Sequence, residues 1–273
     1  MRFDVLTLFP SLIHAYTNES IIGNALEAGH CQLFTHNPRD FSKSKHKKVD
    51  DTPYGGGAGM LLSVQPFYDC LKSLTDLDSL SEAKTKNLEI IIFSPRGETL
   101  NQALVSDLAQ KEQIIMLCGH YEGFDERIYS LSTRVISLGD FILTGGELVA
   151  LTLIDSVSRL VPKVLGSSLS SHTDSFSLAA ELFELDKTEF TKAELKVLES
   201  LLNEYGVNSF KEFRSLSLLE YPHYTRPENF NELKVPAVLK SGDHKKILFW
   251  RIEEALKITK KYRPDLLKAT LSD

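Results

Sequence analysis

Short apolar runs alternate with helically spaced apolar residues along the first 160 residues of the chain. The apolar runs predict strands at 3–9, 31–35, 88–93 and 114–118. Apolar residues three and four positions apart predict helices at 11–28, 64–74, 99–111 and 147–160. Polar or glycine-rich stretches predict a loop and a linker, at 40–63 and 75–87. Continuous apolar strands that alternate with helices indicate an α/β domain with a mainly parallel sheet.

The last third of the chain has a different pattern. Two helices are predicted there, an amphipathic one at 192–205 and a basic one at 245–262. The sequence Val161-Pro162-Lys163 and the serine-rich run 167–171 predict a domain boundary near 161–172. The sequence shows neither an internal repeat nor a low-complexity tract. We therefore expect an α/β domain followed by a smaller helical one.

Composition excludes several classes of protein. The chain has 273 residues, 42% of them hydrophobic, and a formal net charge of −6, as expected of a soluble globular protein rather than a disordered one. No apolar run approaches the roughly 18 residues of a membrane span, and the start Met1-Arg2-Phe3-Asp4-Val5 is unlike a signal peptide. Cys31, Cys70 and Cys118 lack CxxC spacing, which argues against a disulfide framework or a zinc site. We expect a cytoplasmic protein without a membrane partner.

Charge is distributed unevenly. Residues 39–48 hold five Lys or Arg and one acid, and residues 234–268 hold ten against four acids, a local charge of +6. The segment 181–220 is acidic, with nine acids and five bases. Because phosphate contacts depend on local charge, the two basic segments could bind a polyanion. The alternative is a solvated loop and a solvated helix face.

Three glycine-containing loops follow apolar strands, at 94–97, 119–127 and 137–147. Ligands of α/β sheets bind at such strand ends. Glycine lets a ligand approach the backbone closely, and backbone groups there could hydrogen-bond an adenine edge. Each loop alone could equally be an ordinary turn, but three in series favour a ligand site.

Familiar catalytic and nucleotide-binding motifs are missing from the sequence. There is no P-loop, because the glycine-rich run 54–60 lacks the Lys and the Ser or Thr that hold phosphate and magnesium. The G-x-G-x-x-G, HExxH and G-x-S-x-G patterns are also missing. A Rossmann dinucleotide site, a metal hydrolase and a serine hydrolase are therefore disfavoured.

The ordered motifs resemble the TrmD family of bacterial tRNA (guanine-N1)-methyltransferases over nearly the whole chain. In the first half they are Leu8-Phe9-Pro10, Asn37-Pro38-Arg39-Asp40-Phe41, Pro53-Tyr54-Gly55-Gly56-Gly57, Gly59-Met60, Cys118-Gly119, Tyr121-Glu122-Gly123 and Asp125-Glu126-Arg127. Farther on they are Gly145-Gly146-Glu147-Leu148, Ser158-Arg159, Asp174-Ser175-Phe176, Pro222-His223-Tyr224-Thr225-Arg226-Pro227 and Trp250-Arg251.

The resemblance implies a fold and a division into domains. It implies an α/β SPOUT methyltransferase domain with a parallel sheet and a deep trefoil knot, which the general rule against threaded chains would not suggest. We expect this domain at 1–161, a linker carrying the catalytic Asp at 162–176, and a small helical tRNA-binding domain at 177–273. Periodicity by itself gives no sign of a knot.

The resemblance also implies a substrate and a cofactor. It implies methylation of N1 of guanosine 37 of tRNA, next to the anticodon, with S-adenosyl-L-methionine as methyl donor. Magnesium is possible, although no protein site for it is expected. The expected cofactor contacts are Pro95, Gly119, Tyr121, Glu122, Gly123, Leu138, Gly139, Asp140, Phe141, Ile142, Leu143, Gly145 and Gly146. Glu122 could face the sulfonium or the methionine ammonium, or it could be a turn carboxylate.

The chemistry requires a base, because N1 of guanine carries a proton and is a poor nucleophile. The resemblance makes Asp174 this base and Arg159 the cation near the base or the cofactor. Two alternatives stay open from the residues alone. Asp174 could cap the N-terminus of a following helix, and Arg159 could pair with the C-terminus of its own helix.

The basic segments acquire a role through the same resemblance. Residues expected to contact RNA are Arg39, Lys47, Lys48, Gly59, Met60, Lys245, Lys246 and Arg251. Family members are homodimers whose active site combines two subunits, so a homodimer is expected. The alternatives are a non-catalytic RNA-binding module of the same fold and a methyltransferase for another RNA site.

Four features depart from the family pattern. Ala58 stands where Pro is usual, His120 where Arg is common, and Val149 where Pro is frequent. The interval between Phe176 and Pro222 looks longer than is typical and contains the helix at 192–205. We expect this acidic insert, about 177–220, to pack on its own domain or on the partner subunit, away from the tRNA backbone.

Overall fold

The computed structural model describes residues 1–75, 86–166, 174–185 and 189–268. The chain divides into two compact units, Met1–Gly166 and Ser167–Asp273, which we describe separately. Part of the predicted linker 75–87 and the serine-rich run 167–171 lie outside the described residues.

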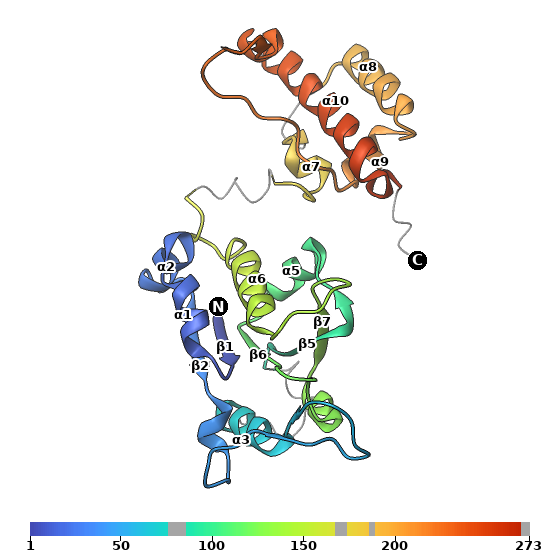
Figure 1. Cartoon of the computed structure of the whole chain (residues 1–273). Coiled ribbons are helices and arrows are strands. Elements are labelled where there is room, and N and C mark those ends of the chain that lie inside the picture. The colour runs from blue at the N-terminus through green and yellow to red at the C-terminus, as the bar shows by residue number, and fades with distance from the viewer. Residues whose placement is uncertain (76–85, 167–173, 186–188, 269–273) are drawn as a thin grey trace. The chain divides into compact units, whose positions relative to one another are not determined.

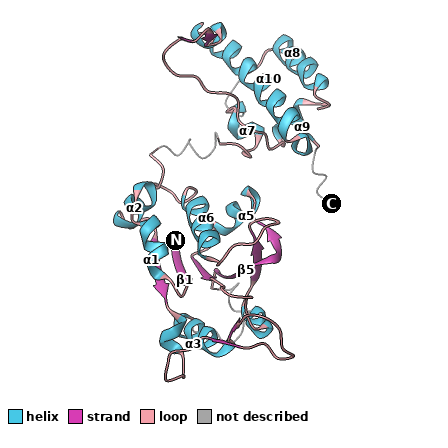
Figure 2. Ribbon diagram, viewed as in Figure 1, coloured by secondary structure: helices cyan, strands magenta, loops and turns pink. Residues whose placement is uncertain are grey.

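The first unit alternates strands and helices as its apolar pattern requires (Figures 1 and 2). Its strands are β1 (Arg2–Leu6), β2 (Gln32–His36), β3 (Asp50–Asp51), β4 (Leu61–Leu62), β5 (Leu88–Thr99), β6 (Gln113–Leu117) and β7 (Arg134–Ser137). Its helices are α1 (Pro10–Thr17), α2 (Ser20–Glu27), α3 (Val64–Leu74), α5 (Gln102–Leu108) and α6 (Glu147–Ser158), with 3₁₀ turns at Pro38–Phe41 and Glu126–Leu131.

The main sheet has the order β2-β1-β6-β5-β7, and all of its neighbouring strands are parallel. Both faces are buried along β1, β6 and the first half of β5, which explains why these strands read as continuous apolar runs, whereas the edge strand β2 is partly exposed. Phe3, Ile91 and Met116 belong to the core on one face, together with side chains of α1, α2, α5 and α6. Ile90 and Ile115 belong to the core on the other face, where α3 contributes its buried side chains. The predicted α/β fold with a parallel sheet is confirmed.

The helix predicted over 11–28 is two helices. The N–H of Asn18 donates to the carbonyl of His14 and ends α1, and Ser20 has a φ of +56° at the start of α2. A Cβ on Gly23 would lie 2.6 Å from the carbonyl oxygen of Asn18, so glycine allows α2 to pack this closely behind α1. The prediction of a single helix was wrong, because the break depends on this contact and not on apolar spacing.

The loop predicted at 94–97 lies within β5, which continues to Thr99. Phe93 and Glu98 both pair with Ile136 of β7, so the residues between them bulge out of the ladder. A Cβ on Gly97 would lie 2.6 Å from the backbone nitrogen of Ile136. The bulge therefore forms where β7 approaches, and the prediction that the strand ends at Phe93 was wrong.

Smaller differences occur at other element ends. β1 ends at Leu6 rather than at residue 9, and Thr7 then accepts a hydrogen bond from the N–H of Phe9. The helix predicted over 99–111 is the shorter α5, which begins after Asn101, whose side chain accepts the N–H of Leu104. The predicted loop 40–63 contains the short pair β3 and β4.

The second unit is largely helical. Its elements are α7 (Ala179–Leu182), α8 (Lys192–Glu204), α9 (Phe210–Arg214), β8 (Asn229–Phe230), β9 (Leu233–Lys234) and α10 (His244–Tyr262), with 3₁₀ turns at Ala237–Lys240 and Pro264–Leu267. Both long helices were predicted to within a residue. α8 begins with a capping box between Thr191 and Glu194, and α10 begins after its N-cap Asp243, whose side chain accepts the N–H of Lys246.

One core holds the second unit together. Leu198 and Leu202 of α8 share it with Ile252 and Leu256 of α10. The amphipathic helix of the segment 177–220 therefore packs within its own unit, as expected from its apolar face.

Candidate cofactor pocket

A cavity of about 410 Å³ opens in the first unit, where β5, β6 and β7 end or bulge. Parallel strands bring these ends to one edge of the sheet. The cavity is lined by three segments and the first turns of α6: Phe93, Ser94, Pro95; Gly119, His120, Tyr121, Glu122, Gly123; Ile136, Ser137, Leu138, Gly139, Phe141, Ile142, Leu143, Thr144, Gly145, Gly146; and Val149.

Backbone hydrogen bonds join the second and third segments. The N–H of Gly146 donates to the carbonyl of Gly119 at 2.9 Å, and His120 and Gly145 form an antiparallel bridge. A Cβ on Gly146 would lie 2.8 Å from the Cα of Cys118, so only glycine allows this approach. In this part of the pocket wall, the backbones of the two segments therefore pack directly against each other.

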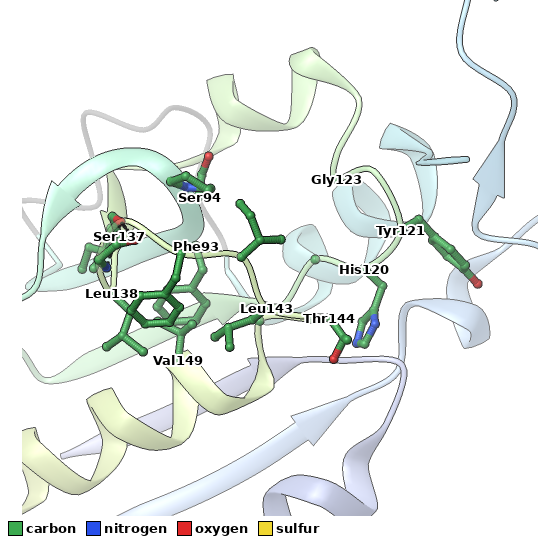
Figure 3. Close-up of a pocket in the computed structure, with 18 of the residues that line it drawn as sticks. Phe93, Ser94, His120, Tyr121, Gly123, Ser137, Leu138, Leu143, Thr144 and Val149 are labelled. Carbon is green, nitrogen blue, oxygen red and sulfur yellow. Dashed lines mark hydrogen bonds between the residues drawn. The ribbon is translucent and has the colours of Figure 1, made fainter. Parts of the chain in front are cut away.

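Apolar and polar side chains share the pocket (Figure 3). Phe93, Leu138 and Val149 gather on one side together with Ser94 and Ser137, and His120 and Thr144 lie on the other. The side chain of Tyr121 points away from the rest and is half exposed. An apolar cleft with a few polar groups is the usual form of a small-molecule site.

A buried carboxylate lies behind His120. Glu147, at the first position of α6, is 3% exposed, and its Oε2 lies 2.7 Å from Nε2 of His120. Its Oε1 accepts the hydroxyl of Thr7 at 2.6 Å. Complete burial, and to a smaller extent the same carboxylate, raise the pKa of the Cys118 thiol well above its usual value.

Twelve of the thirteen residues expected at the cofactor line this pocket. Asp140 is exposed and is not among the lining residues. Four further lining residues, Ser94, His120, Ser137 and Thr144, lie within the three loops predicted to form a ligand site. The lining residues that sequence reasoning missed are Phe93, Ile136 and Val149. Phe93 and Ile136 directly precede two of those loops, so including the last residue of each strand would have found them.

The family profile described as tRNA (Guanine-1)-methyltransferase TrmD matches residues 1–200 and 192–269. The chain belongs to the TrmD family. Membership in the TrmD family carries the SPOUT fold, which agrees with the parallel sheet and the helices of the first unit.

Relatives match the chain over nearly its full length. The tRNA (guanine-N(1)-)-methyltransferase of Clostridioides difficile (strain 630) is 45% identical over 269 residues, which are 98% of both chains. That of Enterococcus faecalis (strain ATCC 700802 / V583) is 43% identical over 98% of this chain and 92% of its own. The segment 177–220 does not make the chain longer than the first of these TrmD relatives.

The two residues expected to carry the chemistry lie in different units. Arg159 is half-buried at the C-terminal cap of α6, and its N–H donates to the carbonyl of Asp155. Asp174 is half-buried in the second unit. The helix that follows it, α7, has Leu178 at its N-cap, so the alternative that Asp174 caps a helix is wrong.

The glycine-rich loop of the TrmD motif touches the pocket through Glu122. Gly59 has a φ of +81°, and a Cβ there would lie 2.6 Å from Oε1 of Glu122. The N–H of Glu122 donates to the carbonyl of Met60 at 3.1 Å. The structure therefore brings Gly59 and Met60, expected to contact RNA, against a residue expected at the cofactor.

Residues of the basic segment 39–48 form hydrogen bonds and an ion pair with one another. Arg39 donates to the carbonyl of Lys47 at 3.4 Å, and Lys47 forms an ion pair with Asp40 at 2.8 Å. Ser42 donates its hydroxyl to the carbonyl of Lys48. The expected RNA contacts Arg39, Lys47 and Lys48 thus share one exposed turn.

The cations expected on α10 have partners in their own unit. Lys245 pairs with Glu194 of α8 at 2.9 Å, and Lys246 pairs with Asp243 at 3.0 Å. The guanidinium of Arg251 lies 4.8 Å from the centre of the Tyr221 ring. All three residues lie on α10, and each has a carboxylate or an aromatic ring beside its charged group.

No helix of the described residues combines the length and apolar character that crossing a bilayer requires. No group of three or more His, Cys, Asp or Glu side chains in the described ranges could hold a metal ion.

Proposed function

We propose that this TrmD-family chain transfers a methyl group from S-adenosyl-L-methionine to N1 of guanosine 37 of tRNA. The observation that carries the proposal is the pocket formed by three glycine-containing segments at one edge of a parallel sheet. The names of the relatives support the tRNA guanine and its N1. Position 37 rests on the resemblance.

The pocket suits an adenosyl group in size and chemistry. Its 410 Å³ falls in the range of about 300–1,000 Å³ typical of small-molecule sites. Phe93, Leu138 and Leu143 offer apolar surface for an adenine ring, and the glycine segments offer backbone donors and acceptors for its edge. When bound, S-adenosylmethionine supplies an electrophilic methyl group on a positively charged sulfur.

The chain must make guanine N1 nucleophilic. In our proposal the carboxylate of Asp174 accepts the N1 proton as the N1–CH₃ bond forms and the bond from sulfur to methyl breaks. Arg159 stabilises the negative charge that spreads onto O6 of the base. Glu122 holds the positive end of the methyl donor, since its carboxylate lies beside the pocket at Gly59.

A homodimer is part of the proposal. Phe9, Leu12 and Tyr16, around and on α1, and Leu148 of α6 are 44–59% exposed, although all are large and apolar. The hydroxyl of Tyr16 donates to Asp155 at 2.5 Å, so α1 and α6 form one surface. Such patches are characteristic of interfaces. In a dimer, Asp174 of one subunit would serve the pocket of the other.

Other parts of the proposal concern partners and fold. Arg39, Lys47, Lys48, Gly59 and Met60 would contact the anticodon region, and Lys245, Lys246 and Arg251 of α10 would contact phosphates. The trefoil knot of the first unit, the tRNA-binding role of the second and a cytoplasmic location remain predictions. So does any need for magnesium.

One assay tests the proposal directly. Purified full-length chain is given methyl-labelled S-adenosylmethionine and a tRNA transcript with guanosine at position 37, beside a matched transcript with adenosine there. We expect label to enter only the first transcript, as 1-methylguanosine. Label in neither transcript would refute the activity, and equal label in both would refute the position.

A further inference from the structure

A chain of hydrogen bonds runs from the pocket wall to the first strand. The carboxylate of Glu147 accepts from His120 at 2.7 Å on one oxygen and from Thr7 at 2.6 Å on the other. The hydroxyl oxygen of Thr7 in turn accepts the N–H of Phe9 at 2.9 Å, and the Phe9 ring meets the His120 ring edge-on with centroids 4.9 Å apart. The chain links residues that are 27 and 140 positions apart in sequence.

The directions of these bonds fix the histidine. An ionised carboxylate only accepts hydrogen bonds, so Nε2 of His120 carries its proton toward Glu147. The side chains of His120 and Glu147 are 17% and 4% exposed, so water competes little for this bond. The imidazole is therefore held in one orientation where it lines the pocket.

The lack of space beside Gly145 shows how closely the His120 ring is packed. A Cβ there would lie 2.5 Å from Nε2 of His120 and 2.6 Å from Oε2 of Glu147. The His120–Glu147 pair thus fills the space beside Gly145, in a segment expected to meet the cofactor. Any rotation of the imidazole would open a gap between the loop after β6 and the start of α6.

We propose that His120, anchored by Glu147 and Thr7, is a positioning residue that holds the two glycine-containing loops in the shape that binds S-adenosylmethionine. The inference rests on the proposed function for the identity of the ligand. Loss of a buried hydrogen bond to a charged group corresponds to about 10- to 100-fold in affinity. We therefore expect His120→Leu to weaken binding of S-adenosylmethionine by that factor, with a smaller effect on kcat.

The experiment measures the Kd of S-adenosylmethionine by calorimetry on the full chain, together with kcat, KM and the thermal midpoint. His120→Arg should restore most of the affinity, because a guanidinium also donates to the Glu147 carboxylate. His14→Leu is the matched control: His14 is half-buried and bonded to Thr35 at 3.0 Å, away from the pocket, and should leave Kd unchanged.

A double-mutant cycle gives the second readout. His120→Leu and Glu147→Gln act on one bond, so the double variant should bind little worse than the weaker single variant. A His120→Leu chain with a lowered thermal midpoint but a wild-type Kd would overturn the proposal, as would strictly additive losses. A wild-type chain that binds S-adenosylmethionine but methylates no tRNA would refute the proposed function and leave this inference standing.

Discussion

The cofactor pocket and the basic helix α10 depend on opposite kinds of residue. The pocket is shaped by glycines with no room for a side chain, such as Gly146 against the backbone of Cys118. On α10 the functional candidates are long charged side chains that already have partners, such as Lys245 with Glu194. A site made by steric fit responds to substitution in an all-or-none way, whereas a compensated charged surface responds gradually. The predictions below test this difference.

The largest effect is expected at Asp174, which belongs to neither region. Asp174→Asn keeps the shape of the side chain but cannot accept the N1 proton. We expect kcat to fall by about 10²–10⁴, the range for a positioned general base, with the Kd of S-adenosylmethionine unchanged. Single-turnover methylation and calorimetry separate the two. A near wild-type kcat would remove Asp174 from the mechanism.

A glycine of the pocket should respond next most strongly. In Gly145→Val the new side chain displaces the His120–Glu147 pair, so binding of S-adenosylmethionine should fall below detection by calorimetry. Gly166→Ala is the control in the same unit, because nothing lies within 4 Å of a Cβ there. Unchanged affinity in Gly145→Val would contradict the view that steric fit governs the pocket.

Charge changes on α10 should act gradually. Replacing Lys245 and Lys246 by Gln should flatten the salt dependence of tRNA binding by about one unit of log–log slope per lost phosphate contact. The structure refines the expectation for the acids of α8. Glu199 and Glu204 are exposed, so their change to Gln should leave the slope unaltered.

Glu194 differs from those acids, because it is half-buried and pairs with Lys245. Glu194→Gln should release Lys245 and steepen the salt dependence slightly. The outcome for the exposed acids is the test. If the Glu199→Gln/Glu204→Gln variant changes the salt dependence of tRNA binding as much as the two lysine changes do, the acidic segment contacts RNA.

The smallest effect concerns pH. The N–H of Thr191, followed by Lys245, lowers the pKa of Glu194 from 4.5 to about 2. A carboxyl with a lowered pKa stabilises the folded state above pH 4.5, and this contribution is lost as pH falls from about 4.5 to about 2. Because Glu194 is near the surface, the shift in the denaturation midpoint should be small.

The single tryptophan, Trp250 of α10, reports unfolding of the second unit in urea by its fluorescence. The midpoint difference between wild type and Glu194→Gln should vanish near pH 2, while Glu199→Gln should match wild type throughout. A difference that persists unchanged at pH 2 would assign the effect to packing rather than charge.

Elements that depend on local spacing of apolar residues could be predicted from the sequence. The apolar run at 114–118 predicted β6. The caps Thr191 of α8 and Asp243 of α10 agree with the predicted starts of these helices. The break between α1 and α2 and the bulge in β5 were missed, because each depends on a glycine that meets a distant or non-helical backbone.

The same distinction holds for the site. The glycine loops could be named from sequence because their glycines stand together after apolar runs. His120 lies in one of those loops and was noted as a departure from the family, but its bond to Glu147 was not predicted, since Glu147 and the supporting Thr7 come from other elements. Pairings between distant elements follow from the fold and are invisible to spacing.

The crowding around Gly145 also constrains how this chain can change over time. Positions 120, 145 and 147 occupy one volume, so a side chain gained at 145 requires a smaller residue at 120 or 147 in the same lineage. A side chain gained at 145 alone would displace the His120–Glu147 pair, whereas position 120 can change by itself to arginine, which also donates to Glu147. Glycine at 145 and the carboxylate at 147 should therefore be retained together, while position 120 alternates between residues that donate to that carboxylate.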